Sequence, residues 1–309
     1  MDELLILNST VSADQAIDSL AKALCSKWPQ LADKPEENPV AALRALWLTA
    51  SGKGCSIQKA AEVSLPLLDA PGRETLKSLI ERRLSGVPLA HLLGWQQFMG
   101  LELRAGPQAL IPRKETEILG TAALNCVREI VRTRGSARVI DVCTGSGNLA
   151  LSLASHEPNC RVFAADLCPE AVNLAKENAQ VHNLQDRVDF RVGDLFAPLD
   201  KPEFHATMDL VVCNPPYLSS SRLRALPREI GEFEPREAFD AGAFGLAIIT
   251  RLIADAPRFL KPESWLCFEV GLGQGPFFAS RVKSAGPYRT IETAVDSAGE
   301  VRALIARTN

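Results

Sequence analysis

The chain has 309 residues, of which 46% are hydrophobic and 23% are charged, and its formal net charge is −3. This composition is that of an ordinary globular protein, and the length allows one large domain or two modest ones. The slightly acidic balance lacks the basic character of a typical nucleic-acid-binding domain, so we expect no direct nucleic-acid partner, although a local basic patch is compatible with it.

Eight cysteines are scattered along the chain, and none of them forms a CxxC pair. Their spacing therefore predicts reduced thiols rather than a disulfide framework or a metal site. The sequence does not begin like a signal peptide, and no apolar run is long enough to span a bilayer. We accordingly expect a cytoplasmic protein with no membrane partner.

The first part of the chain, residues 1–86, predicts a small bundle of helices. Apolar residues recur at helical spacing, and no strand pattern interrupts them. Capping residues and prolines mark the expected helix starts at Ser12, Asn38, Ser56 and Pro71. Gly86 stands where a left-handed C-cap would end the last helix.

Residues 87–112 have a different pattern, which predicts a linker containing a short hairpin around Gly100. A long amphipathic helix follows, and three arginines crowd its C-terminal end, namely Arg128, Arg132 and Arg134. Cations are favourable at the negative end of a helix. We therefore interpret these arginines as helix-end charges in preference to a nucleic-acid patch.

After Gly135 strands and helices alternate, which predicts parallel pairing in a doubly wound sheet. The expected strands are 138–142, 161–165, 187–192, 209–213 and 265–270, and the expected helices are 148–155, 169–182 and 243–259. Two further strands, 290–295 and 301–306, are joined by a short turn, and this terminal hairpin must introduce an antiparallel strand. The expected fold class is thus α/β, with a seven-stranded and mostly parallel sheet. The expected domains are the helices 1–86, the hairpin linker 87–112 and the α/β domain 113–309.

The first expected strand of the sheet leads into a glycine-containing loop, Cys143-Thr144-Gly145-Ser146-Gly147, and then into a helix. Glycines at such a turn let a ligand approach the backbone, and the helix N-terminus offers unpaired N–H groups. Asp166 ends the next strand, where its carboxylate can accept hydrogen bonds from two ribose hydroxyls. The loop therefore predicts a site for a nucleoside-containing cofactor.

Two cofactor classes fit this loop. Gly145, Gly147 and Ala150 satisfy the dinucleotide-binding fingerprint, so a nicotinamide-dependent oxidoreductase is one alternative. Asp141, on the strand just before the loop, favours S-adenosylmethionine, because a carboxylate suits the methionine ammonium better than a pyrophosphate. Asp194 follows the third strand, where it or the neighbouring backbone can meet an adenine edge.

The fourth strand delivers Asn214-Pro215-Pro216-Tyr217 to the same expected edge of the sheet. The side-chain oxygen of Asn214 can accept a hydrogen bond from an acceptor N–H, and the Pro215-Pro216 segment can aim a backbone carbonyl at a second hydrogen. Tyr217 can stack on a planar substrate group. The loop predicts methylation of a planar amide or amino nitrogen, in which positioning and electrostatics carry the rate.

In combination these motifs resemble the bacterial peptide chain release factor glutamine methyltransferases (the HemK/PrmC family), from about Arg82 to the C-terminus. Besides the two loops, the matching segments are Gly86–Gly94, Phe98–Leu101, Leu110–Glu117 and Glu234–Ala238. The chain departs from the family pattern at Cys143, usually glycine, and at Lys114, usually proline. Asp240-Ala241-Gly242 is a loosened form of the usual acidic-glycine-glycine stretch.

The resemblance implies a Rossmann-like methyltransferase domain behind a helical domain that grips a protein substrate. It implies transfer from S-adenosylmethionine to the glutamine amide in the Gly-Gly-Gln loop of a release factor. It further implies cofactor binding by the loop Cys143 to Gly147, Asp166, Leu195 and Asn214, and glutamine binding by Asn214 to Tyr217 with Phe98 as a pocket wall. The remaining alternatives are a methyltransferase for a small amine or amide, for another protein or for a nucleobase nitrogen, and a non-catalytic adapter.

Overall fold

The structure is a computed structural model that describes residues 12–29, 34–218, 228–239 and 246–309. Its contacts divide the chain into two compact units. The first unit comprises Met1–Pro107 and Pro227–Phe233, and the second comprises Gln108–Leu226 and Glu234–Asn309. The chain therefore passes between the units three times, and most of the expected linker 87–112 groups with the helices.

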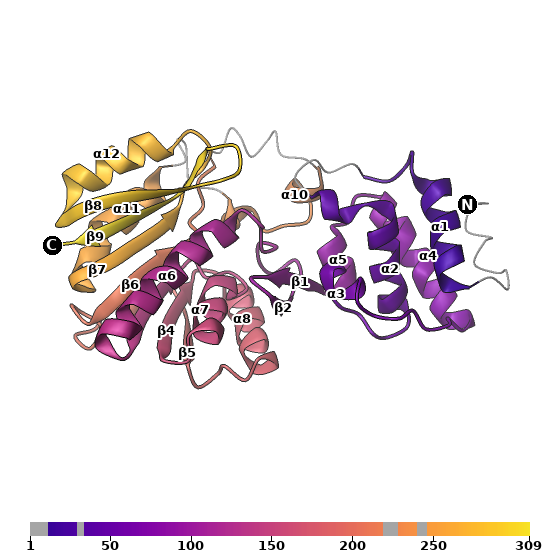
Figure 1. Ribbon diagram of the computed structural model, residues 1–309, viewed down its shortest axis with the longest axis horizontal. Helices are drawn as coiled ribbons and strands as arrows, with labels where there is room; N and C mark the ends of the chain where they lie inside the picture. The colour runs from indigo at the N-terminus through magenta and orange to yellow at the C-terminus, as the bar shows by residue number, and fades with distance from the viewer. Residues whose placement is uncertain (1–11, 30–33, 219–227, 240–245) are drawn as a thin grey trace. The chain divides into compact units, whose positions relative to one another are not determined.

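The first unit is helical, as predicted (Figure 1). Its helices are α1 Ala13–Leu24, the 3-10 helix Pro35–Glu37, α2 Pro39–Ala50, α3 Ile57–Ala60, α4 Ala70–Leu84, α5 Leu89–Leu93 and α10 Arg228–Gly231. Ser12 and Asn38 cap their helices as expected, and α4 begins one residue before Pro71, with Asp69 as its cap. The sequence did not predict α5, because five residues are too few to show a helical period.

The predicted hairpin consists of β1 Trp95–Phe98 and β2 Leu101–Arg104, which pair in antiparallel register. Its two turn residues, Met99 and Gly100, have φ of 46° and 81°. Two successive left-handed residues match the tight turn that suits the twist of paired strands. The expectation of a hairpin around Gly100 is confirmed.

A buried ion cluster joins distant parts of the first unit. Arg83 is fully buried in α4 and donates to Glu37 at 2.8 Å and to Glu229 at 3.0 Å. Lys34 lies 3.4 Å from the Glu229 carboxylate. Burial raises the pKa of Glu37, and the neighbouring cations oppose that rise. The cluster therefore fixes residue 229, which arrives from far along the chain, against the helices.

The second unit is built on a seven-stranded sheet, as predicted. Its strands are β3 Ala137–Val142, β4 Cys160–Asp166, β5 Val188–Val192, β6 Met208–Cys213, β7 Leu260–Glu269, β8 Tyr288–Val295 and β9 Val301–Thr308. They lie in the order β5-β4-β3-β6-β7-β9-β8, and β9 runs antiparallel to both of its neighbours. The terminal hairpin thus adds the antiparallel strand that the sequence required.

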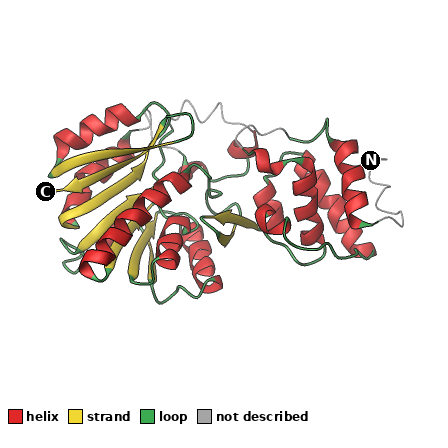
Figure 2. Ribbon diagram, in the orientation of Figure 1, coloured by secondary structure: helices red, strands yellow, loops and turns green. Residues whose placement is uncertain are grey.

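Helices cover both faces of this sheet (Figure 2). They are α6 Thr116–Arg134, α7 Asn148–His156, α8 Pro169–Val181, α11 Ala247–Asp255 and α12 Gly275–Ala285, with 3-10 turns at Ala197–Leu199, Arg236–Ala238 and Ala256–Arg258. Ile140 and Val142 of β3 share one core with Ile249 of α11 and Phe278 of α12. Helices α6, α7 and α8 pack beside one another against the sheet.

Helix α12 was not predicted from the sequence. The expected start of the helix at residue 243, and the stretch Asp240-Ala241-Gly242, lie outside the described residues. Among the helices of the described ranges, none has both the length and the apolar character that a membrane crossing requires.

Strand order determines where a site can form. The chain progresses outward from β3 through β4 to β5, and then returns to place β6 on the other side of β3. Open α/β sheets bind ligands at the carboxyl ends of strands beside such a switch point. This position brings the ends of β3, β4 and β6 together.

Candidate active site

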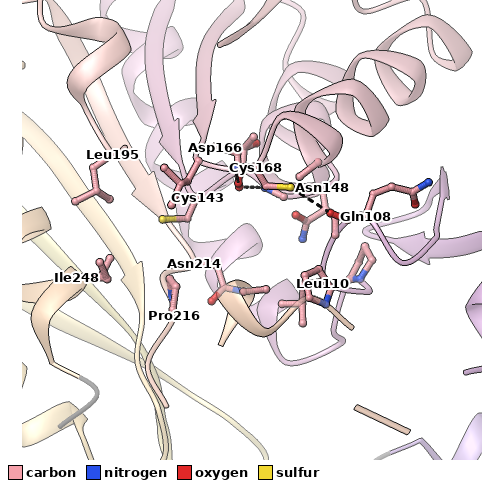
Figure 3. A pocket seen from close by; sticks show the side chains of 18 of the residues that line it. Gln108, Leu110, Cys143, Asn148, Asp166, Cys168, Leu195, Asn214, Pro216 and Ile248 are labelled. Carbon is pink, nitrogen blue, oxygen red and sulfur yellow. Dashed lines mark hydrogen bonds between the residues drawn. The ribbon is translucent and has the colours of Figure 1, made fainter. Parts of the chain in front are cut away.

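A cavity of about 700 Å³ lies at the carboxyl ends of these strands, entirely within the second unit (Figure 3). This volume is typical of cofactor pockets. Eight of the residues predicted from the sequence line it, namely Cys143, Thr144, Gly145, Asp166, Asp194, Leu195, Asn214 and Pro216. The structure therefore brings the two predicted loops to one cavity.

Asp141 supports the glycine loop from behind the cavity wall. It is fully buried, and its Oδ2 accepts hydrogen bonds from the Thr144 hydroxyl at 2.6 Å and from the Ala150 N–H at 3.2 Å. Its Oδ1 has no hydrogen-bond partner among the described residues. Burial raises the pKa of Asp141 to about 7, against the lowering effect of both hydrogen bonds.

The raised pKa predicts a pH-dependent stability. A carboxyl that binds its proton more tightly when folded stabilises the fold at low pH, and this contribution is lost as pH rises from 3.8 to about 7. Asp141→Asn keeps an acceptor for Thr144 and Ala150 but cannot ionise. We expect urea unfolding to show that the variant gains stability relative to the wild type as pH rises from about 4 to about 8. Parallel stability curves for the two proteins would contradict this expectation.

The two loop glycines have different roles. Gly145 has φ 55°, and a Cβ there would meet no atom within 4 Å, so its backbone is open to a ligand. Gly147 has φ 82°, and a Cβ there would lie 3.1 Å from both Ala175 and Phe190. Gly147 is therefore required by the close packing of the helix start, and Ser146 beside it is also buried.

Cys143 also has a left-handed backbone, with φ 60°. The family that this loop resembles usually has glycine at this position. This conformation costs an L residue about 1–2 kcal/mol. We expect Cys143→Gly to stabilise the chain by about 1 kcal/mol in urea unfolding, after some loss of side-chain packing. Cys143→Ala is the control: it keeps the strained backbone and loses the sulfur, so it should be less stable than the glycine variant. A glycine variant that is less stable than the alanine variant would contradict this expectation.

Asp166, at the end of β4, faces the cavity and holds its rim. One oxygen accepts from the Gly145 N–H at 2.8 Å, and the other accepts from the Cys168 N–H at 3.0 Å. Burial raises its pKa, and the backbone hydrogen bonds oppose the rise. The carboxylate is thus fixed between the glycine loop and the start of α8.

Asp194 and Leu195 line the cavity after β5. The Asp194 side chain is half exposed, and its carboxylate pairs with Arg251 of α11 at 2.8 Å. Leu195 is buried and faces the cavity, as does Ile248 of α11 (Figure 3). The wall is therefore mainly apolar here, with the carboxylate at its edge.

The segment after β6 separates the large cavity from a smaller one of about 40 Å³. Asn214 lines both, Pro216 lines the large cavity, and Pro215 and Tyr217 line the small one. The Asn214 Nδ2 donates to the Thr116 hydroxyl at 3.2 Å. The four predicted residues thus form a partition between two adjoining spaces.

Further side chains, for which the sequence predicted no role, hold this partition in place. Gln274 donates to the Tyr217 carbonyl at 3.1 Å and accepts from the Gly271 N–H at 2.9 Å. Glu234 accepts from the Ile111 N–H at 2.9 Å and also from Arg113. Thr116 and Glu234 lie in segments that matched the family, so their position, although not their partners, was visible in the sequence.

Glu269 is the most informative of the residues that were missed. It ends β7, is 2% exposed and lines the small cavity. Burial raises its pKa, and hydrogen bonds from the Thr116 and Tyr217 hydroxyls and the charge of Arg302 oppose the rise. A lone acidic residue at the end of an apolar strand was the available signal.

Four predicted site residues line neither cavity. Asp141, Ser146 and Gly147 belong to the buried side of the glycine loop, and the fourth residue is Phe98. It belongs to β1 in the first unit, is 1% exposed and lines neither cavity. Its predicted role in the substrate pocket stays a prediction.

A family model described as a methyltransferase domain matches residues 134–270. A release factor glutamine methyltransferase of Moorella thermoacetica is 38% identical over 227 residues, which cover 74% of this chain and 77% of the relative. Its counterpart in Thermodesulfovibrio yellowstonii is 33% identical, with 81% of this chain and 88% of the relative covered.

Solved structures show the same fold. The catalytic domain of hMettl16, in complex with the MAT2A 3′UTR hairpin 6, matches with a TM-score of 0.51 and 19% identity. The match covers 67% of this chain and 76% of that one. This likeness concerns the arrangement of the sheet and its helices.

Proposed function

Because the chain belongs to the release factor glutamine methyltransferase family, we propose that it methylates a glutamine side-chain amide in a peptide chain release factor. The acceptor we propose is the glutamine of the Gly-Gly-Gln loop, with S-adenosylmethionine as the methyl donor. The helical unit is proposed to grip the protein substrate, and the reaction is proposed to occur in the cytoplasm.

One observation carries the proposal: of the four residues that line both the large and the small cavity, Asn214 is the one whose side chain is an amide. A methyl donor and a methyl acceptor must meet at one point, and a residue shared by two adjoining cavities marks such a point. The small cavity, at about 40 Å³, has room for the end of one side chain rather than for a ring system. This size favours an amide group over a nucleobase.

The described residues fit the proposed cofactor. Asp166 is fixed at the rim, where it can bind ribose hydroxyls, and Leu195 and Ile248 offer apolar surface to an adenine ring. The unpartnered Oδ1 of Asp141 behind the loop favours a cationic ligand over a pyrophosphate. When bound, S-adenosylmethionine supplies a methyl group from its sulfonium centre.

The chain's own contribution is to hold the acceptor nitrogen. The Asn214 side-chain oxygen accepts one N–H of the amide, and the Pro215 carbonyl is available for the other. Tyr217 closes the small cavity, and burial and the nearby Glu269 raise the pKa of its hydroxyl, which keeps the ring neutral. Orientation and exclusion of water therefore supply the rate, without a strong base before transfer.

Mass spectrometry of a release factor incubated with the chain and S-adenosylmethionine tests the proposal. We expect the mass of one added methyl group on the Gly-Gly-Gln peptide. A release factor whose Gly-Gly-Gln glutamine is replaced by asparagine is the control and should stay unmodified. No methyl gain on the natural release factor, from a preparation that binds S-adenosylhomocysteine, would contradict the proposal.

A further inference from the structure

Three side chains from different elements, Thr116, Asn214 and Glu269, meet beside the proposed acceptor site. Thr116 is the first residue of α6 and is 1% exposed. Its hydroxyl accepts from the Asn214 Nδ2 at 3.2 Å. The same hydroxyl acts on the buried Glu269 carboxyl at the end of β7, because it lowers the pKa of that group against the effect of burial. All three residues belong to the second unit, so the chain of contacts lies within one body.

The chemistry of these groups gives their contacts a direction. An ionised carboxylate attracts the hydrogen of a neighbouring hydroxyl, so we expect the single hydroxyl hydrogen of Thr116 to turn toward Glu269. The remaining lone pairs of that hydroxyl can only accept, and of the two ends of the Asn214 amide only the NH₂ group can donate to them. The Asn214 oxygen is consequently turned away from Thr116.

This direction matters because the two ends of an asparagine amide have nearly the same shape, so packing alone does not select between them. With its NH₂ end toward the substrate, Asn214 would offer hydrogen-bond donors to an amide nitrogen that is itself a donor. The orientation with the oxygen outward is the one that can hold an amide nitrogen.

We propose that Thr116 and Glu269 are positioning residues that fix the Asn214 amide with its oxygen toward the acceptor nitrogen. The inference rests on the proposed function and concerns its substrate-binding step. Glu269 acts on Thr116, and Thr116 acts on Asn214. Thr116 lines neither cavity, so it influences the rate only through the Asn214 side chain, whereas Glu269 also lines the small cavity.

Thr116→Val tests the first link, because valine has the shape of threonine and lacks the hydroxyl. We expect kcat for release factor methylation to fall about 10-fold, the effect of one orienting hydrogen bond, with little change in S-adenosylhomocysteine affinity. Thr116→Ser restores the hydroxyl and should remain within about threefold of the wild type. Glu269→Gln, which can present an amide donor to Thr116, should resemble Thr116→Val.

Thr133→Val is the matched control. It makes the same substitution in the same helix, but the Thr133 hydroxyl bonds only its own helix backbone, at Glu129 and Ile130. It should therefore methylate at the wild-type rate.

The decisive measurement is a double-mutant cycle in single-turnover conditions. If Thr116 acts through Asn214, then Thr116→Val has no further effect on methyl transfer once Asn214 is alanine. A general loss of structure would instead slow transfer equally in both backgrounds. Equal slowing, or a wild-type rate in Thr116→Val, would overturn this inference and leave the proposed function standing. A wild-type chain that does not methylate the release factor would overturn both.

Discussion

Replacing Asn214 with alanine is expected to slow methyl transfer about 100-fold or more, as loss of a preorganised hydrogen bond at a reacting group does. The structure gives the reason, because Asn214 lies at the end of β6 and lines both cavities. Its amide is held by Thr116 rather than by a group that the cofactor would displace. Single-turnover methylation of a release factor measures the effect.

Two further measurements define what the loss means. S-adenosylhomocysteine affinity should change by less than about threefold, because the cofactor's ribose and adenine contacts lie elsewhere. Asn214→Gln keeps the amide but moves it by one methylene, and it should also be slow if position is what matters. Turnover unchanged in Asn214→Ala would remove this side chain from the mechanism.

Asp166→Ala is expected to have the opposite profile, raising the cofactor Kd about 10- to 100-fold, the usual effect of removing a charged hydrogen-bond acceptor. Part of that effect is indirect, because the carboxylate also holds the Gly145 and Cys168 N–H groups at 2.8 and 3.0 Å. Calorimetric titration with S-adenosylhomocysteine measures the change. At saturating cofactor the methylation rate should recover substantially.

Asp194→Ala provides a matched comparison for this prediction. Its carboxylate borders the same cavity, but it is half exposed and already paired with Arg251. Exposed ion pairs are screened by solvent, so its removal should raise the cofactor Kd by less than the removal of Asp166. An equal or larger effect at Asp194 would show that the cofactor's main polar contact is there.

The regular part of the fold was predictable because its signals are local. Apolar periodicity and caps located the helices of the first unit, and alternating strands and helices located the sheet. The elements that were missed lack such signals: α5 has only five residues, and α12 lies between the last predicted parallel strand and the terminal hairpin. Passage of residues 227–233 into the first unit depends on tertiary contacts, which no sequence window contains.

In the candidate site, too, the residues with local sequence signals were predictable and those that depend on tertiary contacts were not. The two loops were recognisable because their residues are adjacent in sequence and follow strands. Glycine spacing alone left a dinucleotide cofactor open, and membership of the methyltransferase family removes that alternative. The partners that orient the loops were not predictable, since Thr116, Glu269 and Gln274 meet them only after β6, β7 and α6 are assembled.

The buried ion cluster around Arg83 has a consequence for biosynthesis. Glu229, which pairs with the Arg83 guanidinium, is synthesised long after the helices that surround this arginine. A nascent chain that has emerged only through β2 therefore carries a buried arginine with one of its two carboxylate partners missing, a costly arrangement. We expect the helical unit to acquire full protease resistance on the ribosome only after residue 233 has emerged, when the larger part of the second unit, Gln108–Leu226, has also been synthesised. Completion of the first unit and folding of the second are thus coupled in time by the order of translation.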